Sequence, residues 1–161
     1  MSPIKLADMS DCSVLRKSWG ELTTAELYSI LKLRTDVFFV EQRIDEEELD
    51  NRDQEPQTEH VWIADDRGVA AYLRVIVDDV ATHLDAHRLF GRVVVRADRR
   101  GEGLAQELMR YVVREHGHDG LLLHAQEYVA PLYAKFGFEA FGDPYREAGI
   151  QHIMMYRAGR P

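Results

Sequence analysis

The chain has 161 residues, 45% of them hydrophobic, and its 28 acidic and 20 basic residues give a formal net charge of −8. This size and composition predict a single globular domain over residues 1–161, and the negative charge argues against a nucleic-acid-binding protein. No apolar run reaches the ~18 residues of a membrane helix. Cys12 is the only cysteine, which excludes an internal disulfide and favours a reducing, cytoplasmic compartment.

The N-terminal half predicts a strand, a helix, a long loop and a hairpin, in that order. Val14–Leu22 is the first candidate strand. Thr23-Thr24-Ala25-Glu26 has the pattern of a capping box, so a helix is expected to begin there. Its apolar stripe at helical spacing consists of Leu27, Ile30, Leu31, Val37 and Phe38. Arg43–Glu59 shows no periodicity and predicts an acidic loop, of a length that is often functional. His60–Ala64 and Val69–Val77 then predict a hairpin.

The C-terminal half alternates strands with helices. The expected elements are a strand at Leu89–Arg96, a helix at Glu102–His116 with Gly117 at its C′ position, a strand at Gly120–Ala125, a short helix between Pro131 and Gly137, and strands at Glu139–Gly142 and Ile150–Tyr156. This alternation predicts an α/β sandwich with a mixed sheet.

A glycine-spaced turn, Arg100-Gly101-Glu102-Gly103-Leu104-Ala105, joins the Val93-Val94-Val95 strand to the following helix. Glycines let backbone N–H groups approach an anion closely, and the helix dipole adds a positive end, so the turn predicts a pyrophosphate site. Arg99 or Arg100 would add charge-assisted hydrogen bonds. The alternative is an ordinary strand-to-helix turn. A P-loop and a dinucleotide fingerprint are excluded, because the Gly-Lys-Ser/Thr and the third glycine are missing.

This turn resembles the acyl-CoA binding loop of the GNAT superfamily of N-acetyltransferases, Arg/Gln-x-x-Gly-x-Gly/Ala. A second segment, Leu132-Tyr133-Ala134-Lys135-Phe136-Gly137-Phe138, is similar to the family's Leu-Tyr-x-x-x-Gly-Phe motif. The resemblance covers roughly Thr23 to Met155. It implies a three-layer α/β/α sandwich with a mixed, splayed central sheet.

The resemblance also implies a donor site for acetyl-CoA. The strand residues Val93, Val94 and Val95 would offer backbone groups to the pantetheine arm, and Gln126 stands where many relatives have an asparagine that touches the cofactor. The residues of the pyrophosphate loop would be Arg99, Arg100, Gly101, Glu102, Gly103, Leu104 and Ala105. Tyr133 would protonate the leaving thiolate, a plausible transfer between a phenol and a thiol with pKa values of about 10 and 8.5. The alternative for Tyr133 is a core aromatic.

A narrower resemblance, to the ElaA-type branch, involves the acceptor side. Its matching segments are Arg34-x-x-Val37-Phe38-x-Val40-Glu41-Gln42, Asp50-x-x-Asp53, His60, Gly91-Arg92-Val93 and Glu147-x-Gly149-Ile150-x-His152-x-x-Met155, with departures at Ala148 and Gln151. Arg34 and Glu41 extend the apolar helix stripe, so they either line a cleft or form a structural ion pair. We therefore expect Arg34, Glu41, His60 and His152 on the acceptor side.

The predicted function is transfer of an acetyl group from acetyl-CoA to a primary amine, by direct attack in a ternary complex. Glu41, His60 and His152 are the candidate general bases. The alternative is a CoA-binding regulatory module without catalysis. The acceptor would be a small-molecule or peptide amine, and the acidic loop would either attract it or form solvated surface. No metal site is expected, because the histidines lack ligand spacing. The oligomeric state stays open, and an exposed apolar strand edge would support a homodimer.

Overall fold

The computed structural model describes residues 14–161, so Cys12 lies outside the described part of the chain. Within these residues one seven-stranded sheet has the order β1-β2-β3-β4-β5-β7-β6. The strands are β1 (Val14–Lys17), β2 (Glu59–Asp65), β3 (Gly68–Val77), β4 (Arg88–Val95), β5 (Leu121–Gln126), β6 (Glu139–Glu147) and β7 (Ile150–Arg157). Neighbouring strands are antiparallel except β4 and β5, which are parallel. The predicted mixed sheet is confirmed.

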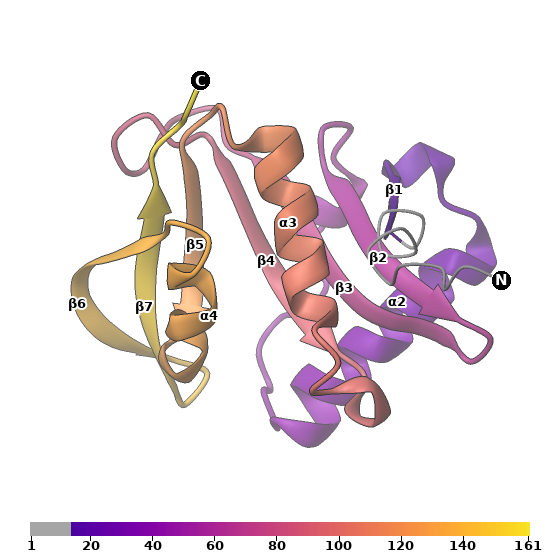
Figure 1. Ribbon diagram of the computed structural model, residues 1–161. Coiled ribbons are helices and arrows are strands. Elements are labelled where there is room, and N and C mark those ends of the chain that lie inside the picture. The colour runs from indigo at the N-terminus through magenta and orange to yellow at the C-terminus, as the bar shows by residue number, and fades with distance from the viewer. Residues whose placement is uncertain (1–13) are drawn as a thin grey trace, which may run out of the picture.

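Helices cover both faces of the sheet (Figure 1). The helices are α2 (Thr24–Arg34), the π-helical η2 (Thr35–Glu41), α3 (Leu104–His116) and α4 (Ala130–Ala134), with 3₁₀ turns η1 (Trp19–Glu21), η3 (Arg52–Gln54), η4 (Ala97–Arg99) and η5 (Glu127–Val129). On one face, α3 and α4 pack onto a core that includes Leu108, Leu123 and Phe138. On the other, α2 packs Ile30 against Trp62. The expected three-layer α/β/α sandwich is therefore confirmed.

The capping box before α2 forms as predicted, whereas the first strand ends early. The Thr23 hydroxyl accepts the Glu26 N–H at 3.1 Å, and the Glu26 carboxylate accepts the Thr23 N–H at 2.9 Å. The strand was expected to run to Leu22 but ends at Lys17. The reason is a second capping box, in which Glu21 accepts the N–H of Ser18 at 3.1 Å and turns the chain into η1.

The apolar stripe of α2 departs from the prediction at one position, and the helix then changes type. Ile30 and Val37 are buried as expected, but Leu33 is buried where Leu31 was expected. From Thr35 the chain is π-helical, with the Gln42 N–H bonded to the Val37 carbonyl at 2.8 Å. Because π-helical turns close five residues apart rather than four, residues after Thr35 leave the line predicted from 3.6-residue spacing.

Two predicted element ends are also corrected. Gly117 ends α3, but its φ of −67° is right-handed rather than the left-handed conformation of a C′ glycine. Glycine is needed there for space, because a Cβ would lie 2.3 Å from the Val113 carbonyl oxygen. The strand expected to end at Gly142 continues as β6 to Glu147, across an irregularity between Phe141 and Tyr145.

Candidate active site

The strands β4 and β5 separate at the centre of the sheet. Their pairing is confined to Arg88 with Leu121 and Leu89 with Leu122. Beyond this point β4 stays paired with β3, and Figure 1 shows β4 and β5 diverging toward the N-terminal end of α3. Val93–Val95 therefore lie in the part of β4 that does not pair with β5. The splay implied by the resemblance is present.

A β-bulge interrupts β4 just before these valines. Arg92 and Val93 together face the single residue Leu73, and Arg92 has a left-handed φ of 52°. The Arg92 guanidinium donates to the Glu48 carboxylate and to the Glu48 carbonyl, both at 3.1 Å. Bulges re-aim backbone groups and are frequent beside active sites. Sequence reasoning missed this one, because a left-handed arginine carries no local signal.

The glycine turn forms a hollow at the N-terminus of α3. Gly101 and Gly103 have φ values of 82° and 80°, in the left-handed region that favours glycine. The first turn of a helix leaves its N–H groups without helical partners, and here these groups adjoin a hollow of about 180 Å³. Its lining residues are Val95, Arg99, Arg100, Gly101, Gly103, Leu104, Ala105 and Gln106. A Cβ on Gly101 would meet no atom within 4 Å, so the space beside it is open. The arrangement suits an anionic phosphate group.

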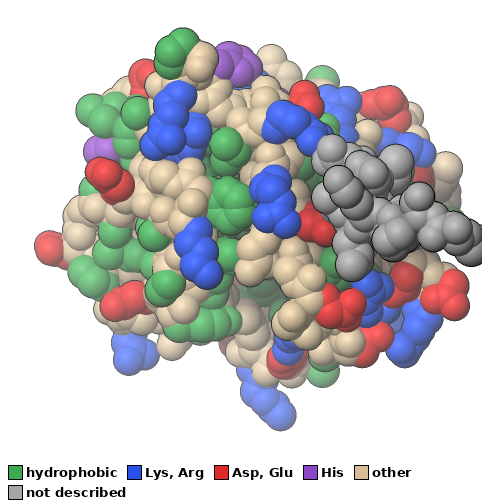
Figure 2. Space-filling view, viewed as in Figure 1, with side chains coloured by type: hydrophobic (Ala, Val, Ile, Leu, Met, Phe, Trp, Pro, Cys, Tyr) green, Lys and Arg blue, Asp and Glu red, His purple; other side chains and the backbone are tan. Residues whose placement is uncertain are grey.

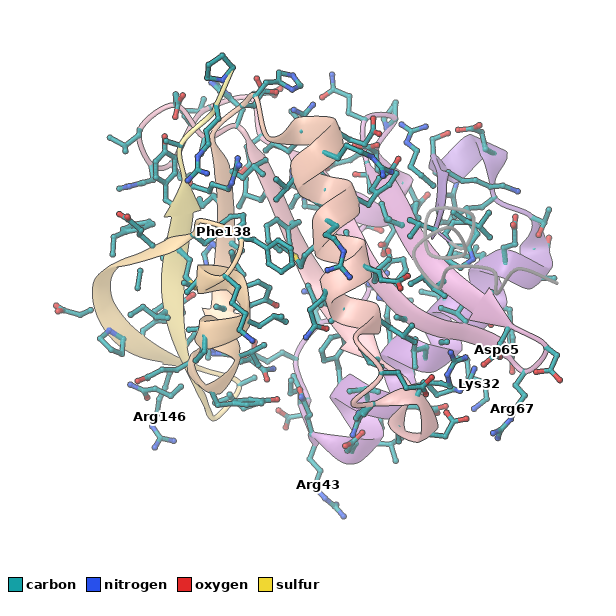
Figure 3. All side chains as sticks on the ribbon, in the orientation of Figure 1. Lys32, Arg43, Asp65, Arg67, Phe138 and Arg146 are labelled. Atoms are coloured by element: carbon teal, nitrogen blue, oxygen red, sulfur yellow. The ribbon has the colours of Figure 1, made fainter. Side chains whose placement is uncertain are left out.

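Carboxylates neutralise the arginines around this hollow. Arg99 binds Asp65 at 2.7 Å and Glu102 at 2.9 Å. Arg100 donates from Nε to the Val95 carbonyl at 3.1 Å, and from its two terminal nitrogens to both carboxylate oxygens of Glu41, at 2.5 and 2.7 Å. In Figure 3, Asp65 and Arg67 lie together at the β2–β3 turn, and Figure 2 shows acidic and basic side chains mixed in that region. The arginines that were expected to bind a pyrophosphate are therefore paired with Asp65 and Glu41, two acids that the sequence did not place beside them.

Tyr133 lies on α4 within the core. Its side chain is buried, and its ring meets Phe90 of β4 edge-on with 5.9 Å between ring centroids. Phe90 also contacts Phe138, which is labelled in Figure 3. Burial raises the pKa of the Tyr133 phenol well above its usual range, so the hydroxyl stays protonated at neutral pH.

Gln126 is the last residue of β5, and its side chain is bonded to Gln42, which comes from a distant part of the chain. The two side-chain amides of Gln126 and Gln42 bond reciprocally, at 3.1 and 3.4 Å. Gln42 directly follows η2. The partner of Gln126 is 84 positions away in sequence, so spacing could not have identified it.

Arg34 lies at the centre of a buried ionic network. It is fully buried, and it binds Asp53 and Glu48 at 2.7 Å each, with its guanidinium over the Tyr72 ring. Arg74 of β3 binds the same Asp53 at 3.1 Å. Burial opposes ionisation of Asp53, but these arginines outweigh it and lower its pKa. The structural ion pair, one of the two alternatives for Arg34, describes this geometry.

The same network folds the acidic loop onto the sheet. Glu48, Asp50 and Asp53 bind arginines from α2, β3 and β4. The acids Asp45, Glu46 and Glu47 are exposed. The solvated-surface interpretation therefore fits only part of the loop.

His60 belongs to this buried network. It has no exposed surface, and its ring nitrogens contact the Tyr72 hydroxyl at 2.8 Å and the Asp53 carbonyl at 3.0 Å. Burial also lowers its pKa. Both ring nitrogens of His60 are thus engaged inside the protein. Glu41 is exposed, by contrast, and is bound to Arg100.

His152 of β7 is placed differently. Its Nδ1 lies 2.8 Å from the Ile150 carbonyl, which only accepts hydrogen bonds, so in the neutral ring Nδ1 carries the proton and Nε2 keeps its lone pair. Nε2 is 4.0 Å from the Glu147 carboxylate. The ring stacks on Tyr145, with centroids 5.7 Å apart.

The strand register places His152 beside Gln126 of β5 on one side and Tyr145 of β6 on the other. The Tyr145 hydroxyl contacts Nδ1 of His124 at 2.7 Å. Sequence reasoning missed Tyr145 and His124. Counting outward from a hairpin turn at Ala148-Gly149 would have placed Tyr145 opposite His152.

Residues 14–161 show neither a candidate metal site nor a candidate membrane-spanning helix. These residues contain no group of three or more His, Cys, Asp or Glu side chains that could hold a metal ion. Among the helices in this part of the chain, none is long and apolar enough to cross a membrane.

Known proteins are similar to this chain in both sequence and fold. The acetyltransferase (GNAT) domain family matches residues 23–158. The UPF0039 protein Rv2851c of Mycobacterium tuberculosis is 36% identical over 149 residues, which is 90% of this chain and 93% of that protein.

Two solved structures are similar over nearly the whole fold. An acyl-CoA N-acyltransferase from Pseudomonas aeruginosa has a TM-score of 0.79 and 36% identity, covering 90% of this chain and 98% of that one. Escherichia coli ElaA has a TM-score of 0.81 and 30% identity, covering 89% and 97%. The chain therefore belongs to the GNAT family of acyl-CoA-dependent acyltransferases, in its ElaA-like branch.

Proposed function

We propose that this protein transfers an acetyl group from acetyl-CoA to a primary amine, by direct attack within a ternary complex. The observation that carries the proposal is the continuity of two features. Val93–Val95, the stretch of β4 that is not paired with β5, leads into the glycine hollow at the start of α3. An extended CoA chain needs this combination of an open strand edge and a phosphate site.

The donor would bind through backbone groups first. The N–H groups of Gly101 to Ala105 would hold the pyrophosphate at the helix N-terminus, and the backbone of Val93–Val95 would bond the pantetheine arm. The phosphate site would be bordered by the side chains of Arg99, Arg100 and Glu102. Gln126, at the end of β5, would contribute its amide to the pantetheine arm.

In the reaction, the amine nitrogen attacks the thioester carbonyl carbon, so that a C–N bond forms and the C–S bond breaks. A backbone N–H of β4 would stabilise the oxyanion that develops on the carbonyl oxygen. The sulfur leaves with the bonding electrons and takes a proton from the Tyr133 hydroxyl. A phenol is protonated at neutral pH, so Tyr133 has a proton to donate; burial raises its pKa and makes it a weaker acid, and the assignment therefore rests on its place on α4 and not on the pKa shift.

His152 is the best candidate to remove the proton from the amine. Its Nε2 keeps a lone pair and has the Glu147 carboxylate 4.0 Å away to stabilise the imidazolium. The two other candidates fit less well, because His60 is fully buried with both nitrogens engaged and Glu41 lies against Arg100 of the glycine hollow, where the pyrophosphate would bind. The acceptor would enter on the side of Gln126 and His152, where exposed Glu147 favours a cationic amine.

The test is turnover of acetyl-CoA with a panel of amines, measured as free thiol. The panel would include polyamines, amino sugars, peptide N-termini and lysine side chains. We expect thiol release that depends on one class of amine and falls sharply in Tyr133→Phe. Tight CoA binding without thiol release for any amine would support the regulatory-module alternative instead.

A further inference from the structure

The end of η2 contacts both sides of the splay through two consecutive residues. Glu41 accepts two hydrogen bonds from Arg100, which belongs to the glycine hollow. Gln42 exchanges two amide hydrogen bonds with Gln126 at the end of β5. In Figure 1, the chain leaving α2 accordingly lies close to the loop that precedes α3. The segment that follows α2 is thus tied to the site we propose for the donor.

The contact with Arg100 occupies the group that a pyrophosphate would use. A guanidinium has five N–H donors. In Arg100, Nε bonds the Val95 carbonyl and one donor on each terminal nitrogen bonds Glu41. The Glu41 carboxylate also cancels the positive charge that would attract a phosphate. Glu41 and a pyrophosphate would therefore compete for the same arginine.

A phosphate group can replace Glu41 as the partner of Arg100 with little loss of free energy. The two side chains are 42% and 47% exposed, so this is a surface ion pair, and such pairs contribute little to stability. A phosphate group has more charge than a carboxylate and forms bidentate pairs with arginine. The Val95 carbonyl would keep holding Arg100 beside the hollow during the exchange.

We propose that Glu41 is a latch on the donor site: it holds Arg100 while the donor is absent, and the donor pyrophosphate displaces it. This proposal rests on the proposed function, and it gives Glu41 a role in donor binding rather than in contacting the acceptor. Displacement frees the C-terminal end of η2, whose neighbouring side chains Phe39 and Val40 are largely exposed and add little anchoring. Donor binding is thereby coupled to the segment that carries Gln42.

The test measures CoA affinity by calorimetry at low ionic strength, where surface charges are least screened. We expect Glu41→Gln to lower the Kd for CoA by about two- to fivefold, the range that corresponds to one surface ion pair. Glu46→Gln is the matched control, because it removes the same charge from an exposed glutamate of the adjoining loop. It should leave the Kd unchanged.

Two further measurements test whether the gain in CoA affinity depends on Arg100 and on the pyrophosphate. In an Arg100→Gln background, Glu41→Gln should no longer change the Kd. The gain should also be absent for S-acetylpantetheine, which lacks the pyrophosphate.

The latch is refuted if Glu41→Gln binds CoA no more tightly than the wild type, if Glu46→Gln gives the same gain, or if the gain persists without Arg100. These results leave the proposed function intact provided that the wild type binds CoA. A wild type that binds no CoA overturns the proposed function and the latch together.

Discussion

Gly101 offers the sharpest test of the donor hollow. Its φ of 82° lies in the left-handed region, and a Cβ there would meet nothing within 4 Å. A Gly101→Ala substitution therefore causes no internal clash, and its effect on stability comes from the backbone alone. The new methyl group would project into the open space where we place the pyrophosphate.

The expected loss of folding stability in Gly101→Ala is small, whereas the expected loss of CoA affinity is large. A left-handed alanine costs about 1–2 kcal/mol, and the reduced freedom of the unfolded chain offsets about 0.4–1 kcal/mol of this. The net loss of about 1 kcal/mol lowers the Tm by about 2–4 °C for a chain of this length. Losing one hydrogen bond to a charged phosphate costs about 1.5–3 kcal/mol, which raises the Kd for CoA by about 10- to 100-fold.

Gly142 provides the matched control. It has a φ of 70°, again with nothing within 4 Å of a Cβ, but it lies on β6. We expect thermal melting to show similar losses for Gly101→Ala and Gly142→Ala, and calorimetry to show weaker CoA binding only for Gly101→Ala. Equal CoA affinity in the two variants would show that the pyrophosphate does not bind beside Gly101.

Three other predictions concern chemistry and pH. Tyr133→Phe should lower kcat by about 10²–10⁴-fold, the usual contribution of a general acid, with CoA affinity nearly unchanged; wild-type rates at every pH would exclude the acid role. His152→Gln should lower kcat with amine acceptors by a similar factor and spare CoA binding, whereas a selective loss of CoA affinity would argue against a base. Burial of Glu59 opposes its ionisation, but the close contact of the His116 ring with its carboxylate and the hydrogen bond from Arg16 outweigh it and lower its pKa to about 2. Because the folded-state pKa lies below the ordinary value of 4.5, the stabilisation of about 3 kcal/mol is complete above pH ~4.5 and is lost as the pH falls toward 2. Glu59→Gln should remove this pH dependence in denaturant titrations, and an unchanged acid transition would contradict it.

The glycine hollow that we propose as the donor site could be predicted from sequence because its determinants are contiguous. A valine-rich strand, two glycines and an amphipathic helix follow one another, and the glycines adopt the left-handed conformations that the turn requires. Local chemistry is enough to specify such a unit. The partners of its arginines were not predictable, because Asp65 and Glu41 come from distant parts of the chain.

The acceptor half depends on non-local structure. Helical spacing put Arg34 and Glu41 on one line, but the π-helical segment breaks that spacing and leaves one residue buried and the other exposed. The bulge at Arg92 uses a left-handed arginine held by Glu48. No sequence pattern marks either feature. The acidic loop that holds Arg92 also binds Arg34 and Arg74, so its contacts join three separate elements.

The most direct test of the central claim is a crystal structure of the protein with bound acetyl-CoA. We expect the pyrophosphate on the N–H groups of Gly101–Ala105 and the thioester between β4 and β5, with its sulfur near the Tyr133 hydroxyl. We also expect that Arg100 has left Glu41. Acetyl-CoA bound outside the β4–β5 splay, or with its pyrophosphate away from the glycine hollow, would show that the glycine hollow and the splayed strands are not the donor site.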